Sequence, residues 1–183
     1  MLIAIARFCR GREGSVMVEF AFAATLFFLL LLGGFEVGRF MLLHQKLSRV
    51  AADSSDLVSR AEELTAADVQ QVFEAAEFIL NPFDLGDDGL LIITSVSTIA
   101  NETPSIDWQF DGAGTGTGTS EIGSGAGQTA VLPDGFTMRP DENVIIAEVF
   151  YDYEPFFGVV TTSQTIYYTG THRPRFGPLN ELQ

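Results

Sequence analysis

Residues 20–35 form an unbroken run of 16 uncharged residues, FAFAATLFFLLLLGGF, which lies between Glu19 and Glu36. With its apolar flanks the run extends over residues 15–43, a stretch of 29 residues in which Glu19, Glu36 and Arg39 are the charged ones. A helix of that length is about 43 Å long, whereas the hydrocarbon core of a bilayer needs about 20 apolar residues. The run therefore predicts a transmembrane helix, with Glu36 and Arg39 at the far membrane surface.

Two other interpretations of the run are a buried core helix and a cleaved secretory signal. A core helix would need protein on every side of residues 27–32, which a chain of 183 residues supplies poorly. A secretory signal ends in small residues in an A-x-A arrangement, and the residues that follow the run, Gly33-Gly34-Phe35-Glu36, lack it. A membrane helix that stays with the protein is the interpretation we favour.

Charge divides the chain into three parts. Residues 1–14 carry three Arg and one Glu, a net charge of +2, and residues 50–172 carry 2 basic and 20 acidic residues, a net charge of −18. The acidic body argues against a nucleic-acid partner. Basic residues stand on both sides of the apolar run, so they do not determine its orientation in a membrane.

Residue types that usually perform catalysis or bind metals are scarce. One Cys and two His cannot make an intramolecular disulfide or a four-ligand zinc site of Cys and His. His44 and His172 lie far apart in the sequence without a recognisable nucleophile, and residues 84–89, DLGDDG, fail the EF-hand pattern. We therefore expect no catalytic residues, no cofactor and no metal site.

The body of the chain predicts helices followed by strands. Apolar residues continue at helical spacing through Leu43, Leu47, Val50 and Leu57. A second helix is expected from a capping box at Thr65 to Asn81-Pro82, with its inward residues being Val69, Val72, Phe73, Ala76 and Ile79.

Strand composition appears in residues 90–99, 105–110, 144–153 and 159–169, the last two as an antiparallel hairpin. Alternation in residues 144–153 predicts a half-buried strand with Glu148 and Asp152 on its less apolar face. Residues 112–127, with seven Gly, predict a flexible loop. The predicted fold class is thus α+β, with a long N-terminal transmembrane helix that continues into a domain of helix and small antiparallel sheet.

A short motif, Gly14-Ser15-Val16-Met17-Val18-Glu19-Phe20, precedes the apolar run and follows a leader that contains three Arg. It resembles the prepilin-peptidase signal of type IV pilins, in the variant of the Flp or tight-adherence (Tad) family. The resemblance implies that a membrane aspartyl peptidase cuts between Gly14 and Ser15 on the cytoplasmic side and leaves the apolar segment attached. A cut there creates an α-amine four residues before Glu19, and this amine, on the same or a neighbouring subunit, can neutralise the carboxylate. The alternative is that Glu19 is an interfacial charge without a partner.

The resemblance extends along the chain to TadE-type pseudopilins. It rests on Phe35-Glu36-Val37-Gly38-Arg39, the helical stretch up to Arg60, the late strand 144–153 and the tail Arg173-Pro174-Arg175. Where many relatives have a Pro in the first turns of the span, this chain has Thr25. The tail arginines either pair with the acidic body or contact a partner subunit.

The resemblance implies four parts: a leader at 1–14, a transmembrane helix at 15–43, a helical stalk and second helix at 44–82, and a β-rich periplasmic domain at 83–183. Gly34-x-x-x-Gly38 permits the close approach of another helix, with Glu36 and Arg39 as further candidates for that packing face. Chance occurrence of the two glycines is the alternative.

The function that the resemblance implies is that of a non-enzymatic, accessory pseudopilin in the assembly of Tad/Flp pili, held in the bacterial inner membrane by a single span. Its implied partners are other pilin-like subunits, Tad inner-membrane assembly proteins, the prepilin peptidase and membrane lipid. Whether the subunit enters the filament, sits at its tip or stays in the membrane as a primer is left open. The main alternative is a membrane-anchored periplasmic binding or sensor domain unrelated to pili.

Overall fold

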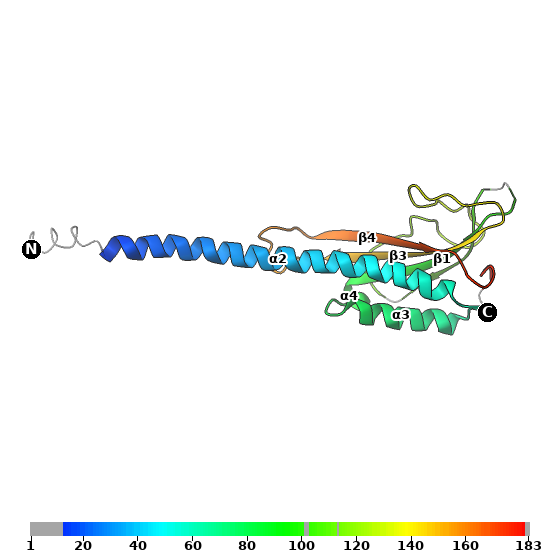
Figure 1. The fold of residues 1–183 in the computed structure, drawn as a ribbon, viewed down its shortest axis with the longest axis horizontal. Helices are drawn as coiled ribbons and strands as arrows, with labels where there is room; N and C mark the ends of the chain where they lie inside the picture. Colours follow the sequence, from blue (N-terminus) through cyan, green and yellow to red (C-terminus); the bar gives the residue numbers. More distant parts are fainter. Residues whose placement is uncertain (1–12, 101–102, 113, 182–183) are drawn as a thin grey trace, which may run out of the picture. The chain divides into compact units, whose positions relative to one another are not determined.

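The structure is a computed structural model that describes residues 13–100, 103–112 and 114–181. Its elements, drawn in Figure 1, follow the chain in this order: α2 (Glu13–Ser59), α3 (Ala66–Leu80), α4 (Leu85–Asp88), β1 (Gly89–Ser97), β2 (Ser105–Asp111), β3 (Asn143–Tyr153) and β4 (Gln164–His172). A long N-terminal helix followed by helices and an antiparallel sheet confirms the predicted α+β fold. Residues 1–12 of the predicted leader lie outside the described residues.

Two compact units make up the described chain. The first contains α2 up to Phe40 together with the segment Pro155–Thr162. The second contains Met41–Glu154 and the chain from Ser163 onward. The segment that joins β3 to β4 therefore belongs with the N-terminal helix rather than with the two strands it connects.

The second unit is built on a four-stranded antiparallel sheet with the strand order β2-β1-β3-β4. The predicted hairpin of β3 and β4 is confirmed, with Val149 opposite Tyr168. The last strand begins at Gln164 and not at residue 159 as predicted. The backbone N–H groups of Val159 and Val160 bond to a side chain of α2 instead of to a strand, which is why the sheet starts later.

The part of α2 in the second unit covers one face of this sheet. Leu43, Leu47 and Val50 are fully buried, as their helical spacing predicts. The helix backbone lies so close to β4 that a Cβ at Gly170 would be 2.3 Å from the carbonyl oxygen of Ala51. Glycine at this position therefore sets how closely helix and sheet approach each other.

Helix α3 begins with the predicted capping box. The Thr65 hydroxyl accepts a hydrogen bond from the backbone N–H of Asp68 at 3.2 Å, and the Asp68 carboxylate accepts one from the N–H of Thr65 at 2.9 Å. The predicted inward side chains are buried except that Leu80 replaces Ile79 at the last position; they are Val69, Val72, Phe73 and Ala76. Leu57 of α2, which was expected to continue the buried stripe, is 42% exposed.

The second face of the sheet is covered by the long connection between β2 and β3. Ile122 and Ala130 from this connection join a buried cluster with residues of the sheet, namely Val96, Ile106, Val144 and Ile146. Strand β3 is therefore buried on both faces, and the prediction that it is half-buried is wrong. Alternation of apolar residues reveals one buried face, but not a coil segment that covers the other.

The Gly-rich residues 112–127 contain neither helix nor strand in their described part, yet they lie against the sheet. The N–H and hydroxyl of Thr117 donate to the Asp152 carboxylate at 2.8 and 2.7 Å. A Cβ at Gly118 would lie 2.6 Å from the ring of Phe150. The glycines permit this close packing, so the predicted loop is present and lies packed against the sheet.

The two arginines of the C-terminal tail pair with acidic side chains of the second unit. Arg175 Nη2 lies 2.8 Å from the Asp56 carboxylate, and Arg173 forms an ion pair with Glu142. Of the two alternatives for the tail, the structure contains the pairing with the acidic body.

Candidate functional site on the N-terminal helix

Helix α2 is long and apolar enough to cross a membrane. In the first unit its large apolar side chains are exposed, among them Val16, Met17, Val18, Phe20, Phe22, Leu26, Phe27, Phe28, Leu29, Leu30, Leu31, Phe35 and Val37. Exposure of such a run on all sides of a helix would be unfavourable in water, whereas lipid tails cover it without cost. The exposed apolar part of α2 is therefore consistent with a membrane anchor, and it does not fit the alternative of a core helix, which would be mostly buried.

The predicted processing motif forms the start of this helix. Gly14 and Ser15 are already helical, and the Ser15 hydroxyl donates to the Glu19 carboxylate, one turn later, at 3.1 Å. The Phe20 side chain is 72% exposed. The Glu19 carboxylate is therefore turned toward the residue that would become the N-terminus after a cut behind Gly14.

A second carboxylate of α2, that of Glu36, lies at the other end of the apolar run and is buried. Only 1% of its surface is exposed. It accepts three backbone hydrogen bonds, from the N–H of Gly158 at 2.8 Å and from the N–H groups of Val159 and Val160, each at 2.9 Å. Hydrogen bonds from several N–H groups offset the desolvation of a carboxylate, which would be costly without partners.

Apolar contacts surround this carboxylate within the first unit. The rings of Phe35 and Phe157 meet edge to face with centroids 6.3 Å apart. A Cβ at Gly33 would lie 3.1 Å from Cγ2 of Val160, so glycine leaves room for that side chain. The Pro155–Thr162 segment is thus held on α2 by one carboxylate and by flanking apolar contacts.

Sequence reasoning placed Glu36 at the membrane surface but missed its partners, residues 158–160. The available signal was the uncharged segment PFFGVVTT, which is unusual within an acidic body and joins two strands of a hairpin. No local pattern connects this segment with a carboxylate more than a hundred residues earlier. The contact is visible only in the folded chain.

The predicted helix-packing residues do not share one face. Gly34 and Gly38 are four residues apart on the same side of α2, and a Cβ at either would meet no atom within 4 Å. Glu36 is about 200° around the helix from Gly34. Its carboxylate is already bonded within the chain. The packing of another helix against the two glycines stays a prediction.

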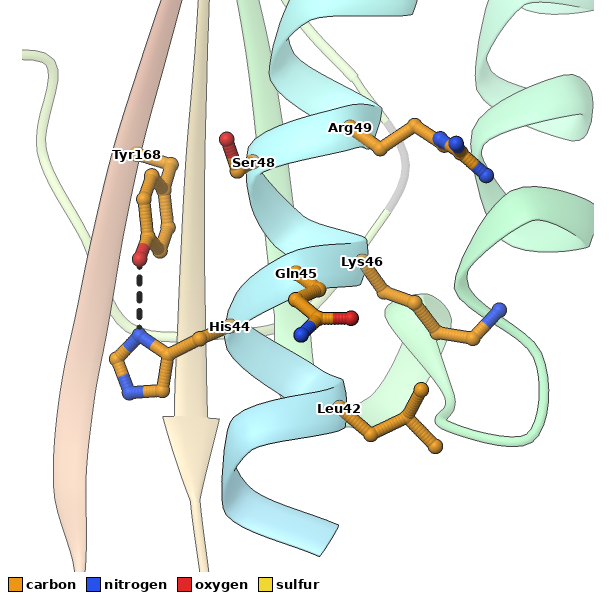
Figure 2. Close-up of a pocket in the computed structure, with 7 residues that line it drawn as sticks. All are labelled: Leu42, His44, Gln45, Lys46, Ser48, Arg49 and Tyr168. Carbon is orange, nitrogen blue, oxygen red and sulfur yellow. Dashed lines mark hydrogen bonds between the residues drawn. The ribbon is translucent and has the colours of Figure 1, made fainter. Parts of the chain in front are cut away.

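A groove of about 740 Å³ lies along α2 in the second unit (Figure 2). His44 Nδ1 and the Tyr168 hydroxyl are 3.0 Å apart on one side of the helix. Lys46 and Arg49 point to the other side, where Lys46 Nζ donates to the carbonyl oxygen of Ile79 at 2.8 Å. The polar side chains that line this groove therefore do not converge on one point, as a catalytic set would.

The second histidine is part of a separate contact. His172 Nδ1 lies 2.8 Å from the Ser55 hydroxyl, which also donates to carbonyl oxygens of its own helix. Ser55 is fully buried. A serine that no substrate can reach is a packing contact between α2 and β4, not a nucleophile.

The carboxylate of Glu148 is the most buried acid of the sheet, with no exposed surface. It accepts hydrogen bonds from the Ser120 hydroxyl, from the N–H of Glu121 at 2.8 Å and from the Tyr167 hydroxyl at 3.0 Å. Burial raises the pKa of Glu148, and these hydrogen bonds offset the rise only in part. Burial and the neighbouring Glu148 charge likewise raise the pKa of Tyr167. This cluster attaches the Gly-rich connection to β3 and β4.

Comparison with known proteins identifies the N-terminal part of the chain. Residues 14–56 match the family model described as TadE-like protein. No curated protein and no solved structure matches the chain. The match covers α2 from its second residue nearly to its end. It confirms the resemblance for this part of the chain and supports a part in Tad pilus assembly in general, but it does not extend to the late strand or the C-terminal tail.

Proposed function

Because residues 14–56 match the TadE-like family, we propose that this chain is an accessory (minor) pseudopilin of a Tad/Flp pilus, anchored in the inner membrane and processed by a prepilin peptidase. One observation carries the proposal: the family match begins at Gly14, and an exposed apolar helix follows it immediately. The TadE-like family is one of pilus-assembly proteins rather than enzymes.

Processing would remove residues 1–14 and leave Ser15 as the first residue. The Gly14–Ser15 bond lies in the first turn of α2, so a peptidase has to unwind that turn to bind it in extended form. Gly14 favours this step, because glycine destabilises a helix by about 1 kcal/mol relative to alanine and has no Cβ to obstruct a narrow cleft.

Glu19 would then pair with the new α-amine. The hydrogen bond from Ser15 to Glu19 keeps the carboxylate on the side of the helix where residue 15 lies, four residues away. Within one subunit the two charges neutralise each other at the membrane boundary. Between subunits the same pair fixes the axial position of one helix against the next.

The α+β domain would face the periplasm, and the helix would store the subunit in the bilayer before assembly. Gly34 and Gly38, which have open space at their Cα atoms, would receive a neighbouring pilin-like helix. The other proposed partners are the Tad inner-membrane assembly proteins and the peptidase itself.

The processing step is tested by the intact mass and N-terminal sequence of protein extracted from membranes of cells with an active prepilin peptidase. We expect a chain that starts at Ser15. Gly14→Leu should leave the chain at full length, and Gly11→Leu, a matched change in the leader, should leave cleavage unchanged. A wild-type chain that still begins at Met1 would refute the processing step.

The assembly step is tested with Glu19→Ala. This variant should reach the membrane in normal amount but abolish or strongly reduce pili on the cell surface, whereas Glu63→Ala, which removes an exposed acid of the second unit, should not. Normal piliation with Glu19→Ala would instead favour the alternative, a membrane-anchored binding or sensor domain unrelated to pili.

A further inference from the structure

The segment Pro155–Thr162 is an apolar patch on the outside of the first unit. Four of its side chains are largely exposed: Phe156 at 70%, Val160 at 56%, Val159 at 47% and Phe157 at 45%. The eight residues include no charged one, although Asp152 and Glu154 come directly before them. Exposed clusters of large apolar side chains mark a surface that is covered in the working protein.

The place of this patch along α2 indicates what covers it. It lies at Gly33, Phe35 and Glu36, which are its contacts on the helix. Counted from Val16 at 1.5 Å per residue, Glu36 is about 30 Å along the helix, the thickness of the hydrocarbon core. The patch therefore stands at the boundary between lipid tails and headgroups on the far side of the bilayer.

Three backbone N–H groups of the segment have hydrogen-bond partners within the protein, as a medium without water requires. Non-helical backbone can lie at membrane depth only when its N–H and C=O groups have partners in the protein. Glu36 supplies that partner for three consecutive N–H groups, those of Gly158, Val159 and Val160. In return the segment covers the carboxylate, so that the charge does not face the lipid tails.

We propose that the segment Pro155–Thr162 is a second membrane-contacting element, which inserts Phe156, Phe157, Val159 and Val160 into the lipid interface beside the transmembrane helix. The ring of Phe157 in the segment meets that of Phe35 on α2, and both side chains are exposed, so the apolar surface of the segment continues that of the helix. This continuity identifies lipid as the occupant. The proposal requires that α2 spans a membrane, and it does not depend on a part in pilus assembly.

The protein would thereby contact the bilayer at two points of the chain, the helix and the link between β3 and β4. A single helix can rotate and tilt freely in lipid, whereas an aromatic pair at the interface fixes its rotation and depth. Because rotation and depth are fixed in this way, the subunit has a defined orientation in the bilayer before any neighbouring subunit binds.

The experiment places one fluorescent label at a time on the full chain, in liposomes of phosphatidylethanolamine and phosphatidylglycerol. Cys9 is first replaced by Ser, and an environment-sensitive dye is then attached at Phe156→Cys or Val160→Cys. Leu29→Cys serves as the reference within the membrane, and Phe176→Cys, an exposed apolar position outside the segment, as the reference in water. Lipids brominated on their acyl chains quench any dye that reaches the interface.

We expect the dyes at 156 and 160 to be quenched severalfold more strongly than the dye at 176, and to lose that quenching when Glu36→Ala is added. Quenching at 29 together with aqueous behaviour at 156 and 160 would overturn the proposal. Dyes at 156 and 160 that are shielded from both water and lipid would also overturn it, because they would show that protein covers the patch.

Discussion

The carboxylate of Glu36 accepts a hydrogen bond from the backbone N–H of Gly158 at 2.8 Å, across 122 residues of sequence. The next two N–H groups bind the same carboxylate. One acidic side chain at the end of an apolar run thus holds the link between two strands.

Glu36→Ala should release the segment Pro155–Thr162 from α2. Its three N–H groups lose a charged acceptor, so their amide protons should exchange with deuterium about tenfold faster or more, a change that hydrogen exchange of the full chain in detergent measures. Glu19→Ala removes a carboxylate of the same helix that binds no N–H of this segment, and it should leave the exchange unchanged. Unaltered protection in Glu36→Ala would contradict the observed bonding.

Gly170→Ala should destabilise the second unit by about 1–3 kcal/mol, because the added Cβ would overlap the backbone of α2 at Ala51. Denaturant unfolding of the detergent-solubilised chain measures the loss. Gly177→Ala is the matched control, since a Cβ there meets no atom within 4 Å. Equal stability of the two variants would show that helix and sheet do not approach as closely as described.

Thr65→Ala should cost about 1 kcal/mol of unfolding free energy, because the first turn of α3 loses its side-chain cap. Thr65→Ser keeps the hydroxyl and should retain most of the stability. The same denaturant titration compares the three chains, and a serine variant as unstable as the alanine variant would argue against the cap.

Glu148→Gln should alter how stability depends on pH. Burial raises the pKa of Glu148 in the folded chain, so the ionised side chain costs stability once the pH rises through that value, whereas below about pH 4 both folded and unfolded chains are protonated. Glutamine avoids this cost. Relative to the wild type, the variant should therefore gain stability as the pH is raised from about 4 to about 7.

Glu142→Gln is the control with the opposite slope. Burial alone would raise the pKa of Glu142, but the N–H of Arg139 and the guanidinium of Arg173 hold it below its usual value. Its contribution is present above the unfolded pKa and is lost as the pH falls through the folded one. Relative to the wild type, this variant should therefore lose stability as the pH rises. If the stability of the two variants changed with pH in the same direction relative to the wild type, both assigned pKa shifts would be contradicted.

Features that depend on neighbouring residues could be predicted from the sequence. The span follows from the length of the apolar run, the capping box follows from Thr65 and Asp68, and most strand positions follow from composition. The family match at residues 14–56 depends in the same way on a contiguous segment, whereas cleavage after Gly14 stays a prediction. Each depends on chemistry within a few turns or strand residues.

Contacts between residues far apart in the sequence could not be predicted from local sequence patterns. Alternation in β3 indicated one buried face but could not reveal that the Gly-rich connection buries Glu148 on the other. The start of β4 was misplaced for a related reason, since Val159 and Val160 have strand-forming side chains but backbone partners on α2. Local propensity describes which secondary structure a residue prefers. It does not indicate which distant group will accept a hydrogen bond from the backbone N–H of that residue.

For this protein, the sequence alone determined that a long apolar helix comes first in the described chain and that helices precede a small antiparallel sheet. The tertiary structure decided which carboxylates are buried and what they bind. The length of an apolar run and the spacing of apolar residues depend on neighbouring residues and on the surrounding solvent. The helices and strands that they predict can therefore be recognised from the sequence. The partners of Glu36 and Glu148 are brought to them only by folding, because a buried charge is stable solely where the whole fold supplies its donors.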